Sequence, residues 1–197
     1  CLSRGLGDVY KRQQLIIVEG EAGSGKTVLM STLLYELGKY NLDLDENLDI
    51  HLLVNHNEHV SIYSQIASKL GIANKKNKIV QKPTSFINNN SSDEKVDVVI
   101  VDEAHLLLTQ GKQSYQGKNH LDDLLARAKV VVIVFDIKQV LTTEQIWEVD
   151  KLNEYFDKAK SNSNHVTLRN QMRINSDIST VNWIRNLVDY QVINSIP

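Results

Sequence analysis

Residues 20–27 read GEAGSGKT and fit the phosphate-binding pattern G-x-x-x-x-G-K-[ST] at every fixed position. In such a loop, glycines let backbone N–H groups turn toward phosphates, and the following helix adds the positive end of its dipole. The pattern places Lys26 on the β and γ phosphates and the Thr27 hydroxyl on Mg²⁺. We therefore predict that a nucleotide is bound by the loop and the start of the next helix, that is by Gly20, Glu21, Ala22, Gly23, Ser24, Gly25, Lys26, Thr27 and Val28.

An acidic pair, Asp102 and Glu103, directly follows the apolar run VDVVIV. At the end of a strand beside a phosphate loop, one carboxylate can hold Mg²⁺ and its waters, and the next can orient or deprotonate an attacking water. We assign the metal to Asp102 together with Thr27, and the water to Glu103. A carboxylate that activates water favours hydrolysis over transfer to a metabolite. The sequence lacks the Asn-Lys-x-Asp or Thr-Lys-x-Asp pattern that reads guanine, so ATP is the expected nucleotide.

A third polar segment, Asp136-Ile137-Lys138-Gln139, follows the apolar run VVVIVF. An amide three residues beyond the end of a neighbouring strand can contact the γ-phosphate and report its loss, which is the role expected for Gln139. The same spacing fits a capping box, with Asp136 at the start of a helix and Gln139 closing it. The two interpretations are compatible.

The elements that must position these residues alternate between strands and helices. A short apolar run precedes the phosphate loop, and apolar residues at helical spacing follow it as far as Gly38. Further strands are predicted at HLLVN, VDVVIV, VVVIVF and HVTL, and helices at 143–160 and 176–192, while residues 74–95 are expected to form an exposed excursion. Strands with valine or isoleucine at nearly every position are typical of a parallel sheet covered on both faces. The predicted fold class is α/β.

Bulk properties narrow the possibilities only slightly. The chain has 197 residues, of which 42% are hydrophobic and 23% charged, enough for one core. Its net charge of -2 gives no global attraction to nucleic acids or acidic membranes, so such binding would need a local patch. The single cysteine, Cys1, excludes an internal disulfide framework, and no apolar run approaches the roughly eighteen residues of a membrane span. We expect a cytoplasmic protein with no membrane partner.

The two ends of the chain differ from its middle. Residues 1–13 read CLSRGLGDVYKRQ, and DVYKRQ back-translates to a sequence that resembles the end of a transposase-based sequencing adapter. We expect a non-native leader there, the alternative being a native disordered N-terminus. Residues 14–160 are predicted to form the ATP-binding domain. Residues 161–197 are predicted to form a linker and the start of an incomplete second domain.

Taken together, the motifs resemble the first motor domain of superfamily-one helicases, and more closely the helicase-like ATPases related to the Schlafen C-terminal region. The matching segments are GEAGSGKT, VDEAH, FDIKQ and LRNQMR. The resemblance implies a RecA-like P-loop fold, Gln139 as γ-phosphate sensor and Arg173 as an arginine that approaches the phosphates from the second domain. The tetrapeptide DEAH also occurs in superfamily-two helicases, but their Ser-Ala-Thr motif is absent and FDIKQ stands in its place.

The resemblance further implies that catalysis occurs in a cleft between two motor domains. The second domain supplies an arginine finger, which is worth about 10³ to 10⁵ in rate. The tail of this chain is too short to contain that finger. We therefore expect the chain to bind Mg·ATP and to hydrolyse it very slowly.

Contacts with single-stranded nucleic acid are predicted at Asn55, His56, Lys82 and Phe86. Asn55 and His56 lie where helicases place a strand contact, although the alternative is a turn in which Asn57 caps the next helix. Lys82 and Phe86 belong to NKKNKIVQKPTSF, whose lysines and aromatic suit a backbone and a stacked base, or else a solvated loop. His56 and His59 have the spacing of a metal pair but lack a third zinc ligand in the sequence nearby.

Three functions remain open from the sequence. The first is an ATP hydrolase that moves on, or remodels, single-stranded DNA or RNA. The second is a regulatory ATP-dependent switch that binds a protein partner in stress or defence, without translocation. The third is a small-molecule kinase. Stimulation of hydrolysis by single strands, stimulation by a protein only, and phosphate transfer to a metabolite distinguish them.

Overall fold

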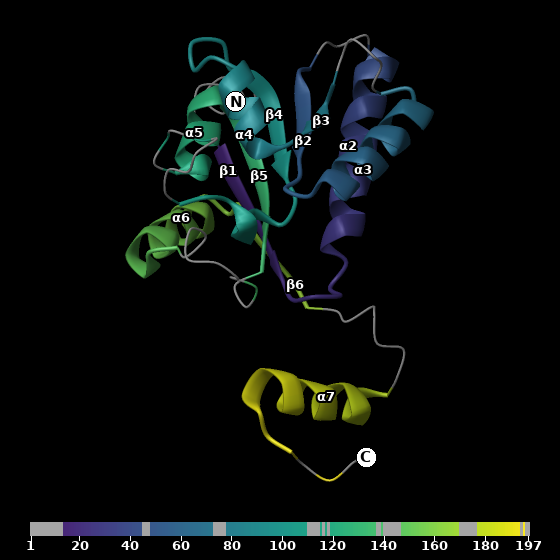
Figure 1. The fold of residues 1–197 in the computed structure, drawn as a ribbon, viewed down its shortest axis with the longest axis vertical. Coiled ribbons are helices and arrows are strands. Elements are labelled where there is room, and N and C mark those ends of the chain that lie inside the picture. The colour runs from purple at the N-terminus through teal and green to yellow at the C-terminus, as the bar shows by residue number, and fades with distance from the viewer. Residues whose placement is uncertain are drawn as a thin grey trace, which may run out of the picture.

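A parallel sheet forms the centre of the structure (Figure 1). The computed structural model describes residues 14–44, 48–72, 78–109, 115, 117, 119–136, 139, 147–169, 177–193 and 195. The strands are β1 (Gln14–Gly20), β2 (Ile50–Leu53), β3 (Val80–Gln81), β4 (Val96–Val101), β5 (Ala128–Phe135) and β6 (His165–Leu168). Their order is β3-β2-β4-β5-β1-β6, and every neighbouring pair is parallel. The predicted α/β, RecA-like class is confirmed.

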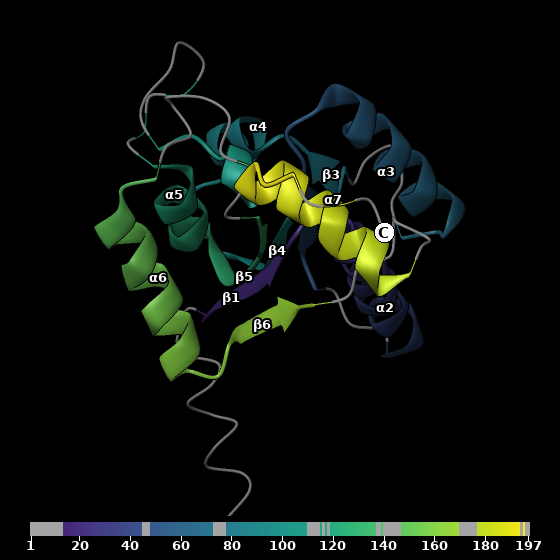
Figure 2. The same ribbon diagram turned by 90° about the horizontal axis from the view of Figure 1, so that it is seen from below.

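Helices cover both faces of the sheet (Figures 1 and 2). One face carries α2 (Lys26–Leu44) and α3 (Asn57–Lys69), and the other carries α4 (Pro83–Asn89), α5 (His120–Arg127) and α6 (Val149–Ser161). The short 3₁₀ helix η1 (Ala104–Leu106) follows β4, and α7 (Ile178–Tyr190) follows β6. In the part of the chain that the structure describes, no helix combines the length and apolar character needed to cross a membrane.

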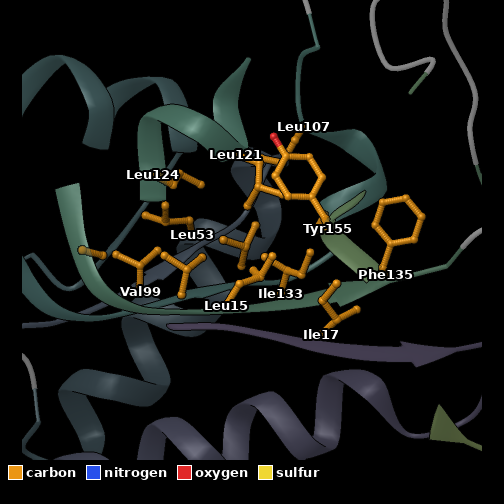
Figure 3. Close-up of a cluster of buried hydrophobic side chains, with 14 of the residues drawn as sticks. Leu15, Ile17, Leu53, Val99, Leu107, Leu121, Leu124, Ile133, Phe135 and Tyr155 are labelled. Atoms are coloured by element: carbon orange, nitrogen blue, oxygen red, sulfur yellow. The ribbon is translucent and has the colours of Figure 1, made fainter. Parts of the chain in front are cut away.

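The pleat of each strand divides its side chains between two cores, as the valine-rich runs require. On β1, Ile17 packs into the core under α4, α5 and α6, which Figure 3 shows, whereas Val18 packs into the core under α2 and α3. On β4, Val99 and Ile100 divide in the same way. All four are almost fully buried, and burying one such side chain stabilises the fold by about 1.5–3 kcal/mol.

The prediction of an exposed excursion over 74–95 is wrong for residues 79–89, whereas residues 91–95 are exposed and belong to no helix or strand, as predicted. Residues 80–81 form β3, and α4 begins at Pro83, the first helical position, where proline is well tolerated. Phe86 and Ile87 of α4 are buried in the core, and the Phe86 ring packs edge-to-face on the imidazole of His51 at 5.0 Å. A polar-looking segment therefore contributes a core helix.

The two C-terminal helices were predicted in the right places but with longer bounds. The described helix α6 begins at Val149, and residues 143–146 lie outside the described residues. Helix α7 begins at Ile178, where the Asp177 side chain accepts hydrogen bonds from the backbone N–H groups of Ser179 and Thr180. That capping geometry explains the start of the helix.

Three strands bring their carboxyl ends to one edge of the sheet. Strand β5 pairs with β1 on one side and with β4 on the other, with Glu19 opposite Phe135 and Val101 opposite Ile133. The residues that follow these strands, Gly20, Asp102 and Asp136, therefore emerge close together. Helix α7 lies beyond this same edge in both views (Figures 1 and 2).

Candidate nucleotide site

The loop from Gly20 to Gly25 connects β1 to the first turn of α2. Gly23 and Gly25 have φ angles of 85° and 91°, a region that favours glycine. A Cβ atom on Gly20 would lie 2.4 Å from Oγ of Ser24, so the loop closes tightly on itself there. The pattern of glycines in the sequence thus has a direct conformational cause.

Lys26 is buried and points back into the loop. Its Nζ donates to the backbone oxygens of Gly20 at 2.7 Å and Glu21 at 2.9 Å, and to Oδ2 of Asp136 at 3.2 Å. These three acceptors match the three donors of an ammonium group. A phosphate in the loop would compete with them for the same protons.

Asp102 lies at the end of β4 with 1% of its surface exposed. Its Oδ1 accepts from the backbone N–H of Glu103 at 3.0 Å, and its Oδ2 accepts from the Tyr63 hydroxyl at 3.1 Å. Burial raises the pKa of Asp102, the nearby charge of Glu103 raises it further, and the two hydrogen bonds lower it. The carboxylate is held by these two hydrogen bonds, and no cation among the described residues contacts it directly.

Glu103 has φ 55° and ψ 49°, the left-handed conformation. A non-glycine residue held there costs of order 1–3 kcal/mol, and such residues gather at functional sites. The conformation turns the chain sharply from β4 into η1 and lets the side chain line a pocket. That pocket is bounded by loop residues, by Glu103 and by a residue after β5, namely Ala22, Gly23, Gly25, Lys26, Thr27, Val28, Glu103 and Gln139.

Gln139 reaches the pocket from the segment after β5. Its Nε2 donates to Oδ2 of Asp136 at 2.9 Å, and its backbone N–H donates to the backbone oxygen of Asp136 at 3.1 Å. The helix that the capping-box interpretation requires falls on residues 140–146, outside the described residues. Gln139 nevertheless lines the same pocket as Thr27 and Val28.

Asp136 is a site residue that the sequence analysis missed, having assigned it only to a helix cap. It is buried, and its Oδ2 joins the ammonium of Lys26 to the amide of Gln139. The predicted order of the strands could have identified Asp136. A carboxylate that ends the strand next to the one preceding a phosphate loop must lie opposite that loop.

His105 is buried below Glu103 and has its ring edge-to-face with Phe135 at 6.2 Å. Its Nε2 lies 3.1 Å from Oε2 of Glu103. Burial lowers the pKa of His105, and the neighbouring Lys26 lowers it too, although Asp136 and Asp102 oppose this. The imidazole is thus a neutral neighbour of Glu103 rather than a counter-charge at neutral pH.

The four predicted nucleic-acid residues have different fates. Asn55 is half-buried and His56 is exposed, both between β2 and α3 at the carboxyl edge. His56 is the N-cap residue of α3 without a side-chain capping bond, so the capped-turn alternative is not what the structure shows. Lys82 is half-buried at the start of α4. Phe86 is 0% exposed, and the prediction that it stacks a base is wrong because the core needs it.

The structure brings most of the other predicted site residues together and does not describe one of them. Lys26, Thr27, Glu103 and Gln139 line one pocket, and Asp102 adjoins it. Arg173 lies outside the described residues. The described helix α7 does approach the loop, since the Arg185 guanidinium lies 2.6 Å from the Glu21 carboxylate.

Comparison with known proteins gives one family and several partial relatives. Residues 13–197 match the family described as Schlafen group 3, DNA/RNA helicase domain. The uncharacterized protein YPL245W of Saccharomyces cerevisiae is 33% identical over 190 residues, which cover 89% of this chain and 41% of the yeast protein. The chain thus spans less than half the length of that relative.

Two solved structures show a distant likeness. The arterivirus nonstructural protein 10 helicase has a TM-score of 0.49 at 15% identity, covering 100% of this chain and 43% of that one. The Pif1 helicase of Candida albicans has a TM-score of 0.44 at 16% identity, covering 94% and 42%. The family match confirms the predicted relationship to Schlafen-type helicase-like ATPases. The chain belongs to the Schlafen group 3 DNA/RNA helicase domain family.

Proposed function

We propose that this chain binds Mg·ATP in the pocket between the loop and Glu103, and that it is part of an ATPase that acts on single-stranded nucleic acid. Membership in a helicase domain family supports nucleoside triphosphate hydrolysis in general. The main observation in support of Mg·ATP binding is a single pocket lined by a lysine, a hydroxyl, a carboxylate and an amide from three different segments. These residues are Lys26, Thr27, Glu103 and Gln139.

The residues present fit a magnesium nucleotide. Oγ of Ser24 is enclosed in the loop and makes no hydrogen bond to a described residue, and Oε2 of Glu103 is enclosed at its rim with Nε2 of His105 at 3.1 Å. Enclosed polar atoms of this kind are costly unless a ligand or water satisfies them. The hydroxyl of Thr27 and the carboxylate of Asp102 are hard oxygen donors, the type that Mg²⁺ prefers. When bound, Mg²⁺ would neutralise charge that develops on the phosphates.

Each residue then has a defined task. Lys26 exchanges its contacts with the backbone oxygens of Gly20 and Glu21 for phosphate oxygens, and Asp136 keeps it aligned. Thr27 and Asp102 hold the metal. Glu103, kept at the rim by its left-handed backbone, orients a water and takes its proton. Gln139 contacts the γ-phosphate and loses that contact after hydrolysis.

The proposed strand contact is Asn55 and His56, together with Lys82, which follows β3, the strand that pairs with β2. The Nδ2 atom of Asn55 is enclosed without a hydrogen-bond partner among the described residues, and the His56 ring is exposed beside that of His59 at 5.6 Å. Both follow β2 at the same edge of the sheet as the pocket. We further propose that the residues after β6, the strand that pairs with β1 in the central sheet, begin a second motor domain and that Arg173 belongs to it.

One observation favours the alternative of a switch that binds a protein partner. Helix α3 exposes three large apolar side chains at successive i, i+4 positions, with Ile62 54%, Ile66 39% and Leu70 40% exposed. Such a stripe is what a partner helix would bury. The motor proposal stands first because the family is a helicase domain family.

The test is steady-state ATP turnover by the protein extended through the second motor domain, with and without single-stranded DNA or RNA, because the chain alone is expected to hydrolyse ATP very slowly. We expect turnover that rises with added strand and is abolished by Glu103→Gln. The exposed Glu94 provides the matched control, Glu94→Gln, which should behave as wild type. Turnover that depends on Glu103 but ignores every strand would contradict the motor proposal and favour the switch.

A further inference from the structure

Tyr63, in the middle of α3, has no role in the function described so far. Its side chain is 5% exposed, and its hydroxyl donates to Oδ2 of Asp102 at 3.1 Å. A buried tyrosine hydroxyl needs a partner, but that need alone does not explain why the partner is the carboxylate that ends β4.

The same hydroxyl also meets the first turns of α2. The side chains of Thr27 and Ser31 both contact it, and those contacts lower its pKa against the larger raising effects of burial and of Asp102. Ser31 in turn donates from Oγ to the backbone oxygen of Thr27 at 2.8 Å. The Tyr63 hydroxyl therefore lies between the two residues to which we assign the metal, and it remains protonated at neutral pH.

The remaining hydrogen bond of Asp102 leaves its orientation dependent on Tyr63. Oδ1 accepts from the backbone N–H of Glu103, which comes from the next residue and does not fix the rotation of the carboxylate against α2. Among the described residues, Tyr63 supplies the side-chain donor to Asp102. Groups that hydrogen-bond to a metal-ligating carboxylate commonly set its orientation.

We propose that Tyr63 is a positioning residue for the magnesium site, holding the Asp102 carboxylate in register with the Thr27 hydroxyl. This inference rests on the proposed function, because it presumes that these two residues hold the metal. It also gives α3 a purpose beyond packing. The helix begins at Asn57, directly after the proposed strand contact, and two turns later it delivers a hydroxyl to the metal site.

The experiment measures magnesium dependence of nucleotide binding, apart from turnover. ATP carrying an N-methylanthraniloyl group on its ribose is titrated with the full chain in EDTA and then at increasing magnesium chloride. Tyr63→Phe removes the hydroxyl and keeps the ring. The matched control is Tyr155→Phe, since Tyr155 is also buried and donates to a carboxylate, that of Asp122, on the opposite face of the sheet.

For Tyr63→Phe we expect the magnesium concentration at half-maximal binding to rise about tenfold, the lower end of what outer contacts to metal ligands contribute. Affinity in EDTA, and the whole profile of Tyr155→Phe, should match wild type. In an Asp102→Asn background, Tyr63→Phe should add nothing, because it acts through that carboxylate.

Three results would count against the inference. An unchanged magnesium requirement in Tyr63→Phe overturns it while leaving the nucleotide site intact. Equal weakening in EDTA and in magnesium overturns it too, because it indicates a packing role alone. An additive effect on top of Asp102→Asn overturns the stated route. Failure of wild type to bind the labelled ATP at all would instead refute the proposed function.

Discussion

Two polar clusters are buried in this molecule, and they differ in how completely the protein satisfies them. The closed cluster, on α5 and the residues just before it, consists of Tyr115, Asn119, His120 and Asp123. Its histidine uses both nitrogens: Nδ1 accepts from the backbone N–H of Leu108 at 3.1 Å, and Nε2 lies 3.2 Å from Oγ1 of Thr84. The open cluster, at the pocket, leaves Oγ of Ser24 and Nδ1 of His105 without hydrogen bonds to described residues.

This difference separates polar residues that stabilise the fold from polar residues that are available to bind a ligand. Polar groups buried with every partner supplied by the protein fix a unique packing, in this case of α5 against the loop before it. Polar groups buried with capacity left over, beside a strained backbone such as that of Glu103, are poised for something else to bind. Substitutions in the open cluster should therefore change activity, and those in the closed cluster should change stability.

The largest expected effect compares one aspartate from each cluster. Asp102→Asn should lower ATP turnover by at least about 100-fold, because it removes a metal ligand, and should not lower the free energy of unfolding, because a buried charge beside Glu103 disappears. Asp123→Asn should leave turnover unchanged and reduce stability, because the Asp123 carboxylate accepts from Tyr115 and from Arg127 at 3.0 Å. Both variants should be assayed for ATP turnover and for urea unfolding. Lost turnover in Asp123→Asn, or lost stability in Asp102→Asn, would contradict the expectation.

The ion pair between Lys26 and Asp136 tests whether residues of the open cluster also contribute to the free energy of unfolding. Asp136→Ala leaves the buried ammonium of Lys26 without its carboxylate, and removing one member of a buried pair costs about 3 kcal/mol or more. We expect that loss in urea unfolding. The double variant Lys26→Met with Asp136→Ala should recover part of it. A single variant as stable as wild type would show that the pair is solvated.

Acid should weaken the closed cluster through His120. Burial lowers the pKa of His120 from 6.5 to about 4, so the unfolded chain binds a proton that the folded chain does not. Stability from this residue is complete above pH 6.5 and is lost as the pH falls toward 4, by about 2 kcal/mol between pH 7 and pH 5. Urea unfolding of wild type and His120→Asn at both values measures it. Equal pH dependence in the two proteins would refute the assignment.

The smallest effect concerns the start of α5. The Oδ1 atom of Asn119 accepts from the backbone N–H groups of Leu121 at 2.8 Å and Asp122 at 3.3 Å. Asn119→Ala should cost about 1 kcal/mol of stability, as expected for loss of an N-cap. ATP turnover at saturating nucleotide should not change. A fall in turnover without a fall in stability would contradict the structural role assigned to Asn119.

The sequence alone was enough to predict the site where a chemical motif lies directly beside a strongly predicted strand. The loop from Gly20 to Thr27 and the run VDVVIV could be placed because glycine spacing and continuous β-branched residues leave few alternatives. Strand ends then followed, and with them Asp102 and Glu103. The structure shows Glu103 in the pocket with the loop residues and Asp102 next to it, while their roles stay predictions.

Other features depended on contacts between distant segments and could not be predicted. Helix α4 looks polar, and only the space beside His51 and the core makes Phe86 a core residue. Tyr63 resembles any apolar position on the inner face of α3 until β4 is placed beside it. Asp136 becomes a partner of Lys26 only because β5 pairs with β1.

The central claim, that the edge formed by β1, β4 and β5 holds a nucleotide, is tested most directly by calorimetric titration of the chain with ATP and Mg²⁺. The wild-type chain should bind one ATP, and Lys26→Ala should lose that binding while remaining folded. Lys95→Ala, an exposed lysine at the opposite edge of the sheet, should bind as wild type does. Binding that survives Lys26→Ala, or no binding by the wild-type chain, would contradict the account.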